Sequence, residues 1–202
     1  MACSDFSALD LTKQFGVKFK AETFFTDSQM ITPSSLLFEA LNRGQELGFG
    51  SEKSRSERLA KPILLELSSL NRHEFSIYSG MNLDIVEAAG LRGECDFIFS
   101  FSRIQDFVTV PIFCIAEAKK QDLGQGTIQA AAQLLGAKKL NQLEGNSFET
   151  LCACVTTGIE WRFLQLNANT ITIDEERYLI SRLPGLLGVL QTIISLAKAQ
   201  VN

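Results

Sequence analysis

The sequence predicts a mixed α/β domain in which a central mixed sheet is flanked by helices. The order of the expected elements supports this prediction: two helices, three strands, a helix, further strands and a last helix. The helical segments have apolar residues at the spacing of one helical face, and the strand segments are short apolar or alternating runs between turn residues. Elements of both kinds along one chain indicate a sheet with helices packed against it.

The length and composition fit one ordinary globular domain. The chain has 202 residues, of which 46% are hydrophobic and 21% are charged, and this is enough to bury a core. The net charge of −4 and the pI of about 5.1 argue against a general nucleic-acid binder. They leave open an enzyme that acts on nucleic acid, because a bound metal would neutralise its acidic site.

The cysteines and the apolar runs indicate in which cellular compartment the protein is expected. Five cysteines without a CxxC pair fit neither a zinc site nor a disulfide framework, so we expect buried reduced thiols. No apolar run reaches the length needed to span a bilayer, and the N-terminus lacks a signal-peptide pattern. The sequence therefore predicts a cytoplasmic protein with no membrane partner. The single histidine, His73, is expected at the surface in a polar turn.

The first predicted helix begins at Thr32, which acts as a cap and is followed by Pro33. Proline is tolerated in the first helical turn because its missing N–H would have no partner there. The helix includes Leu37 and Leu41 and is expected to end in the glycine-containing segment 48–50. Residues 1–31 have no clear period and are left without assigned elements.

A second helix is predicted from Ser51 to about residue 70. Its apolar stripe has the spacing of one helical face and consists of Leu59, Ile63, Leu67 and Leu70. Pro62 lies inside this helix and is expected to kink or interrupt it. When the stripe is extended toward the N-terminus it reaches Glu52, whereas Glu57 lies on the opposite side of the helix.

Three strands follow, at residues 75–78, 96–101 and 107–118. The polar segment 102–106 separates the last two, so we expect them to form an antiparallel hairpin. The remaining predicted elements are a helix at about 127–143, strands at 151–157, 160–166 and 170–173, and a helix at about 184–199. The wide apolar face of the last helix would cover the sheet or serve as a homodimer contact.

The candidate catalytic side chains are those of Asp96, Glu117 and Lys119. Glu117 and Lys119 lie two residues apart at the end of an apolar strand and therefore share a face, and Asp96 opens the preceding strand. Two carboxylates hold a hard cation that takes phosphate oxygens as further ligands, and a lysine beside them offsets negative charge on the phosphate. The alternative is that Glu117 and Lys119 form a solvated strand end and that Asp96 is a turn residue.

The combination of Asp96 and Glu117-x-Lys119 after a hairpin resembles the PD-(D/E)xK nuclease superfamily, which has a restriction-endonuclease-like core. Three other segments resemble motifs of this superfamily in the same order: the helix motif in 51–64, the helical glutamine motif in 126–133 and the strand hairpin in 156–163. The resemblance spans about residues 51–166 and is strongest to small, uncharacterised single-domain bacterial members, many of them cyanobacterial. It implies a single domain with a core at 51–166, a helical extension at 1–50 and a C-terminal strand and helix at 167–202.

The resemblance also implies a magnesium- or manganese-dependent phosphodiester hydrolase that acts on nucleic acid, with DNA favoured over RNA. In this reading Asp96 and Glu117 are the metal ligands, and the backbone carbonyl of Ala118 is a third. The alternative is a non-catalytic protein of the nuclease fold that acts as a binding or scaffold module. A chance match in an unrelated α/β protein is a third interpretation.

The other roles implied by the resemblance belong to side chains around these ligands. Lys119 would position or activate the attacking water, and Glu52 would be the acid contributed by the preceding helix. Gln129 would orient the site or contact the nucleic-acid backbone. Gln133 stands where many members have a tyrosine, so the resemblance assigns it no contact to a base or sugar. Gly124 and Gly126 lie just before the predicted helix at 127–143 and match no phosphate-binding pattern, so independently of the resemblance they are expected to have a loop or capping role.

Overall fold

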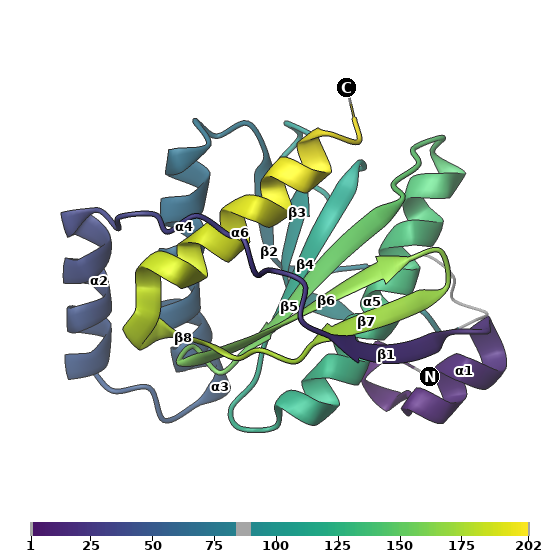
Figure 1. The fold of residues 1–202 in the computed structure, drawn as a ribbon, viewed down its shortest axis with the longest axis horizontal. Coiled ribbons are helices and arrows are strands. Elements are labelled where there is room, and N and C mark those ends of the chain that lie inside the picture. Colours follow the sequence, from purple (N-terminus) through teal and green to yellow (C-terminus); the bar gives the residue numbers. More distant parts are fainter. Residues whose placement is uncertain (1, 84–89, 202) are drawn as a thin grey trace.

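An eight-stranded mixed sheet forms the centre of the molecule (Figure 1). The computed structural model describes residues 2–83 and 90–201. The strand order is β1-β7-β6-β5-β4-β3-β2, with β8 beside β6. The strands are β1 (Lys18–Glu22), β2 (Ser76–Asn82), β3 (Glu94–Ser100), β4 (Ile112–Ala118), β5 (Thr150–Thr156), β6 (Glu160–Asn167), β7 (Thr170–Asp174) and β8 (Tyr178–Leu179). The pairs β1–β7 and β4–β5 are parallel and the others are antiparallel, so the predicted mixed sheet is confirmed.

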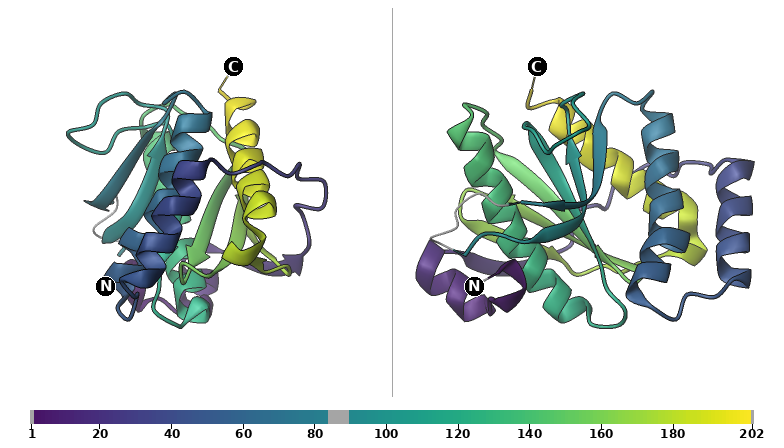
Figure 2. Two further views of the ribbon diagram at one scale, coloured as in Figure 1. Left: turned by 90° about the vertical axis from the view of Figure 1, so that its left-hand side faces the viewer. Right: turned by 180° about the vertical axis from the view of Figure 1, so that it is seen from behind.

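Helices cover both faces of this sheet. They are α1 (Ala8–Phe15), α2 (Ser35–Glu46), α3 (Glu52–Arg55), α4 (Lys61–Leu70), α5 (Leu123–Leu143) and α6 (Leu183–Lys198), with short turns at Cys3–Asp5, Ser56–Ala60 and Ile180–Arg182. In Figure 1, α5 lies behind the sheet and α6 lies in front of it, while α2 lies outside α4. Figure 2 shows the same layers from one side and from behind.

The unit β4–α5–β5 explains why the middle of the sheet is buried on both faces. Parallel strands need a crossover connection, and α5 supplies it between β4 and β5. All seven residues of β4 are buried, as expected for a strand covered on both sides. The antiparallel hairpin predicted upstream is also confirmed, because β3 pairs with β4.

Residues 52–70 form one continuous helix with a π-helical turn at Ser56–Ala60. The turn lies just before Pro62, which has no N–H to donate to the residue four positions earlier. The N–H of Lys61 donates to the carbonyl of Ser56, five residues back. The predicted interruption at Pro62 therefore takes the form of a π-turn.

The predicted apolar stripe of this helix is correct except at its end. Leu59, Ile63 and Leu67 are at most 1% exposed, whereas Leu70 is 45% exposed. Asn71 occupies the buried position instead, because a residue four positions after Leu67 lies closer to the same helical face than one three positions after it. The amide of Asn71 donates to Gln191 of α6 over 2.7 Å.

Several predicted boundaries are wrong. Strand β2 extends to Asn82 rather than to residue 78, and β3 begins at Glu94 rather than at Asp96. Ser34 rather than Thr32 caps α2, because its Oγ accepts the N–H of Leu37 over 3.1 Å. Strand β4 begins at Ile112 and not at residue 107, since Pro111 has no N–H for the sheet and the chain before it forms a loop. Helix α5 begins earlier than predicted, because Asp122 caps it by accepting the N–H of Gln125.

The first 31 residues contain a helix and a strand that the sequence analysis left unassigned. Ser7 caps α1 through the N–H of Asp10, and Gly16 ends it with a φ of 66°. Strand β1 then pairs with β7 at the edge of the sheet, and four of its five residues are exposed. An exposed edge strand has no buried face, which is why no hydrophobic period marks it.

All five cysteines are buried thiols that form no disulfide among the described residues, and His73 is exposed, as predicted. The segment Ile180–Lys198 is long and apolar enough to cross a membrane, so the expectation that no run reaches this length is wrong by that criterion. Half of its most apolar window is buried inside the protein. Core helices also meet this criterion, so it says little about the membrane.

Candidate active site

Strands β3 and β4 bring Asp96 and Glu117 to the same face of the sheet. Phe97 of β3 pairs with Ala116 of β4, so continuing the antiparallel register by one residue sets Asp96 opposite Glu117. Oδ2 of Asp96 accepts a hydrogen bond of 2.8 Å from the N–H of Ala118. This end of β4 and the start of α5 lie at the bottom of Figure 1, near α3.

Glu117 is a buried carboxylate with hydrogen bonds to both oxygens. It is 3% exposed. Lys119 Nζ and Gln129 Nε2 donate to its Oε1 over 2.8 and 2.5 Å, and Gln133 Nε2 donates to its Oε2 over 3.0 Å. A buried carboxylate is costly without a partner charge and hydrogen bonds, and both are present here.

Lys119 lies between Glu117 and the helix that precedes the core. Its Nζ is 2.8 Å from Glu117 Oε1 and 3.8 Å from Glu52 Oε1, and its side chain is 16% exposed. Oε2 of Glu52 accepts the backbone N–H of Lys120 over 3.2 Å. Glu57 is exposed and makes no hydrogen bond or ion pair with these residues, so the structure brings Glu52 to the site and not Glu57.

Burial and neighbouring charges shift the pKa of Asp96, Glu117 and Lys119. Burial and the carboxylate of Asp96 raise the pKa of Glu117 to about 7, against the opposing effect of Lys119 and Gln133. Burial also raises the pKa of Asp96, although the N–H of Ala118 and the charge of Lys119 oppose this. Burial lowers the pKa of Lys119, but Glu117, Glu52 and Asp96 outweigh it and raise the pKa above its usual value. The site therefore favours more positive charge than Lys119 alone provides.

The oxygen atoms of the site suit a hard cation that keeps part of its water shell. Asp96 Oδ1 accepts no hydrogen bond from the described residues, and Gln133 Oε1 is buried without a donor. Ala118 is the last residue of β4 and lies beyond the last β3–β4 pair. Within residues 2–83 and 90–201, no group of three or more His, Cys, Asp or Glu side chains is arranged to hold a metal ion. A cation at this site would therefore have few protein ligands and keep several waters, as Mg²⁺ does in other proteins.

Two residues of α5 were missed as parts of this site. Gln133 contacts Glu117, and the signal that could have found it is its position four residues after Gln129, on the same helical face. Gly126 lies against Lys119, as described further below, and no local sequence signal marks that contact. The structure brings together Asp96, Glu117, Ala118, Lys119, Glu52 and Gln129, which are all the residues that the sequence singled out.

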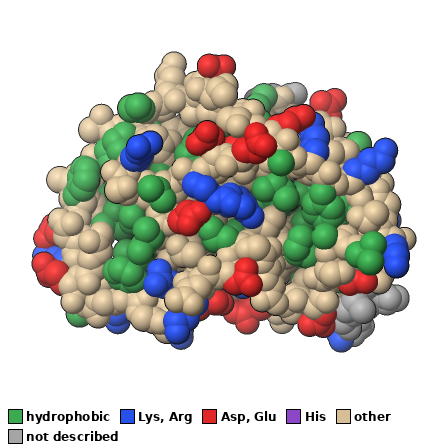
Figure 3. Space-filling view, turned by 60° about the horizontal axis from the view of Figure 1, so that its bottom comes forward, with side chains coloured by type: hydrophobic (Ala, Val, Ile, Leu, Met, Phe, Trp, Pro, Cys, Tyr) green, Lys and Arg blue, Asp and Glu red, His purple; other side chains and the backbone are tan. Residues whose placement is uncertain are grey.

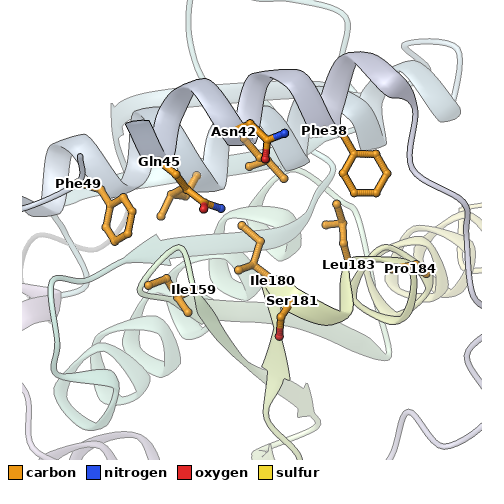
Figure 4. Close-up of a pocket in the computed structure, with 11 residues that line it drawn as sticks. Phe38, Asn42, Gln45, Phe49, Ile159, Ile180, Ser181, Leu183 and Pro184 are labelled. Atoms are coloured by element: carbon orange, nitrogen blue, oxygen red, sulfur yellow. The ribbon is translucent and has the colours of Figure 1, made fainter. Parts of the chain in front are cut away.

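A separate groove of about 480 Å³ lies between α2 and the segment that leads into α6 (Figure 4). Apolar side chains such as Phe38, Phe49 and Ile159 line most of it, and Asn42 and Gln45 add amide groups. No acidic or basic side chain lines this groove. It offers no group for acid–base or metal chemistry, so the end of β4 remains the candidate active site.

The surface on this side of the molecule carries both signs of charge. Figure 3 brings the lower side of Figure 1 toward the viewer and shows Lys and Arg side chains among Asp and Glu side chains, with hydrophobic side chains on either side. This agrees with the net charge of −4. A nucleic acid would therefore be held by a few basic side chains rather than by a broad basic surface.

Comparison of the chain with protein-family profiles, curated proteins and solved structures gives no match. The resemblance to the nuclease superfamily therefore rests on the sequence motifs alone.

Proposed function

We propose that the protein is a metal-dependent nuclease with a restriction-endonuclease-like core that hydrolyses phosphodiester bonds in DNA. One observation carries the proposal: the buried carboxylate of Glu117 lies opposite Asp96 and is bonded to Lys119. Burial is the main cause that raises the pKa of both Asp96 and Glu117; two such acids beside a lysine are a costly arrangement, and such arrangements cluster at functional sites.

The side chains around the acid pair would divide the work. Asp96 and Glu117, with the carbonyl of Ala118, would hold Mg²⁺ or Mn²⁺, which when bound polarises the phosphate and lowers the pKa of water. Lys119 would orient the attacking water and offset charge that develops on the phosphate.

Glu52, Gln129 and Gln133 would hold this arrangement in place. Glu52 fixes the chain after β4 through the N–H of Lys120. Gln129 and Gln133 fix the carboxylate of Glu117, which favours an orienting role for Gln129 over a contact to the nucleic-acid backbone.

An arginine on the same face of the sheet supports an anionic substrate. Val155 pairs with Glu117 on one side and with Arg162 on the other, so all three share the face that α5 covers. Arg162 is partly buried; among the described residues its Nε finds no acceptor, and its Nη1 donates to Thr127 Oγ1 over 3.3 Å. It forms no ion pair with the described acidic residues, which leaves its charge available to a phosphate group.

A second candidate is a non-catalytic protein of the same fold that binds or organises a partner. The observation that favours it is that both oxygens of Glu117 already have protein donors, so this carboxylate is satisfied without a cation. The two candidates differ in what a cation does to these hydrogen bonds. In a cleavage site the cation displaces at least one donor from Glu117, whereas in a non-catalytic protein all the donors stay in place. The cytoplasmic location and a homodimer remain predictions of the sequence.

Cleavage of plasmid and single-stranded DNA with Mg²⁺, Mn²⁺ or a chelator tests the nuclease proposal. We expect cutting with either metal and none with the chelator. Asp96→Asn should abolish cutting because it removes the charge of one ligand and keeps the side-chain shape. Asp106→Asn is the matched control, because Asp106 is an exposed aspartate in the loop before β4.

Two results would overturn the assignment in different ways. Metal-dependent cutting that survives Asp96→Asn would show that the activity resides elsewhere. No cutting of any substrate, together with no heat of Mn²⁺ binding in calorimetry, would leave the non-catalytic function in its place.

A further inference from the structure

Helix α5 passes unusually close to Lys119 at one residue, Gly126. Gly126 is the fourth residue of α5 and is buried. A Cβ atom built on it would lie 2.8 Å from Cγ of Lys119 and 2.6 Å from Cγ1 of Val155. Side-chain carbons do not approach so closely, so any larger residue at this position must displace a neighbour.

The close approach determines the direction of the lysine side chain. The Cγ of Lys119 contacts the helix backbone, while its Nζ is 2.8 Å from Glu117 Oε1. A long, flexible side chain that is held at its stem and at its tip has few rotamers left. Glycine is about 1 kcal/mol less favourable than alanine inside a helix, so local helix stability gives no reason for glycine here.

We infer that Gly126 is a positioning residue for Lys119: its missing side chain lets the backbone of α5 form the wall that directs the ammonium group to Glu117. The effect on cleavage rests on the proposed function. The placement of Lys119 does not, and it can be measured in a protein with no activity.

Amine modification measures this placement. The intact protein is treated briefly with dilute acetylating reagent, and the ratio of label on Lys119 to label on Lys120 is read by mass spectrometry. Lys120 is an internal reference because it is adjacent and exposed. In the unaltered protein Lys119 should label at least 5-fold less than Lys120, because it is largely buried and paired with Glu117.

Gly126→Ala should raise the ratio of labelling at Lys119 to that at Lys120 at least 3-fold, because the new Cβ displaces the stem of Lys119. Gly124→Ala is the matched control in the same helix. Its Cβ would lie 3.1 Å from Oδ1 of Asp122 and within 4 Å of no atom of Lys119, so the ratio should not change.

The same substitution in a Val155→Ala background keeps the inference testable if Gly126→Ala alone does not fold. Removal of Val155 Cγ1 relieves the closer of the two contacts and leaves the contact with Lys119. The double variant should fold and still label Lys119 faster than Val155→Ala does. An unchanged labelling ratio in either folded variant would overturn the inference.

The nuclease assay separates this inference from the proposed function. If the protein cuts DNA, Gly126→Ala should lower kcat more than it changes KM, and Gly124→Ala should alter neither. If the protein cuts no DNA, the labelling ratios still decide whether Gly126 places Lys119, and only the proposed function fails.

Discussion

Glu117 and Asp174 are two carboxylates with the same burial and different surroundings. Glu117 is 3% exposed and Asp174 is 0% exposed, and burial is the main cause that raises the pKa of each. Asp174 accepts the N–H of Glu176 and the hydroxyl of Tyr178, which lie within four residues of it. Glu117 is held by Lys119 and by two glutamines of α5, and it lies opposite a second acid.

The difference separates a carboxylate that builds a turn from one that belongs to a site. Neutral donors from the next few residues are enough to keep Asp174 in place at the end of β7, as in many turn-capping interactions. Glu117 lies beside a like charge on the neighbouring strand, Asp96, and an opposite charge two residues further along its own chain, Lys119. Asp174 also has acidic neighbours, Glu175 and Glu176, but they adjoin it in sequence and no basic residue is paired with it among the described residues. Burial alone therefore does not identify a functional carboxylate; the paired lysine and the facing acid of another strand do.

The largest expected effect is on the cleavage rate when Lys119 is replaced, since a paired lysine is what distinguishes Glu117 from Asp174. Lys119→Met should reduce metal-dependent cleavage by about 10²- to 10⁴-fold, because it removes the group that orients the attacking water and keeps most of the apolar stem. Lys120→Met should have little effect, since only the backbone N–H of Lys120 enters the site. Initial rates at saturating Mn²⁺ measure both. Equal losses in the two variants would remove the special role of Lys119.

The next effect is on cation affinity and compares the two carboxylates directly. Glu117→Gln should weaken Mn²⁺ binding by at least roughly 100-fold, equivalent to about 2.8 kcal/mol, because a charged ligand is lost. Asp174→Asn should leave the affinity unchanged, as its partners are neutral donors of a turn. Calorimetric titration of both variants checks this. Equal affinity in Glu117→Gln and the unaltered protein would place the cation elsewhere.

The pH dependence of stability should reveal the acid pair without any metal. The pKa of Glu117 is about 7 in the folded state and near 4.3 in an unfolded chain, so the folded state holds the proton more tightly between these values. The contribution of Glu117 to the free energy of unfolding is then largest below the unfolded pKa. It falls as the pH rises toward 7, by an amount on the order of 3 kcal/mol. Asp96 adds to the fall in the same direction, because its pKa is also raised.

Urea unfolding in the presence of a chelator between pH 4.5 and pH 8 measures this fall. Glu117→Gln should flatten most of it, and saturating Mn²⁺ should reverse it at pH 7 and above because the cation binds the ionised form. In Asp174→Asn, the part of the fall in stability that is caused by Glu117 should remain. The same slope in Glu117→Gln and the unaltered protein would show that Glu117 is ionised throughout.

How much of the fold and the site could be predicted from the sequence depends on how far apart in sequence the interacting residues lie. Strand hairpins and the crossover helix carry local apolar patterns, so the mixed sheet and the convergence of Asp96, Glu117 and Lys119 could be predicted. The apolar stripe of the second helix also predicted Glu52 at the site, although the π-turn at Ser56–Ala60 separates Glu52 from the later residues of the stripe.

Other features depend on partners that are distant in sequence. Strand β1 lies at an exposed edge and gains its structure by pairing with β7, which no local pattern shows. The closeness of Gly126 to Lys119 results from how α5 packs on β5, and a glycine near a helix start looks the same in sequence whether it is a cap or a contact. The resemblance assigned no role to Gln133 because it replaces a tyrosine, yet its position on the helix brings it to Glu117.

The smallest effect concerns the turn around Asp174. Tyr178→Phe removes the hydroxyl that donates to Asp174 over 3.0 Å and keeps the ring that packs edge-on against Phe163. Unfolding should become easier by roughly 1–2 kcal/mol, because Asp174 then retains only the N–H of Glu176 as a donor. Urea unfolding at pH 7 measures the loss, and Mn²⁺ affinity should be the same as in the unaltered protein. A change in affinity would mean that the turn at β7 and the site at β4 are coupled, and the distinction between the two carboxylates would then be wrong.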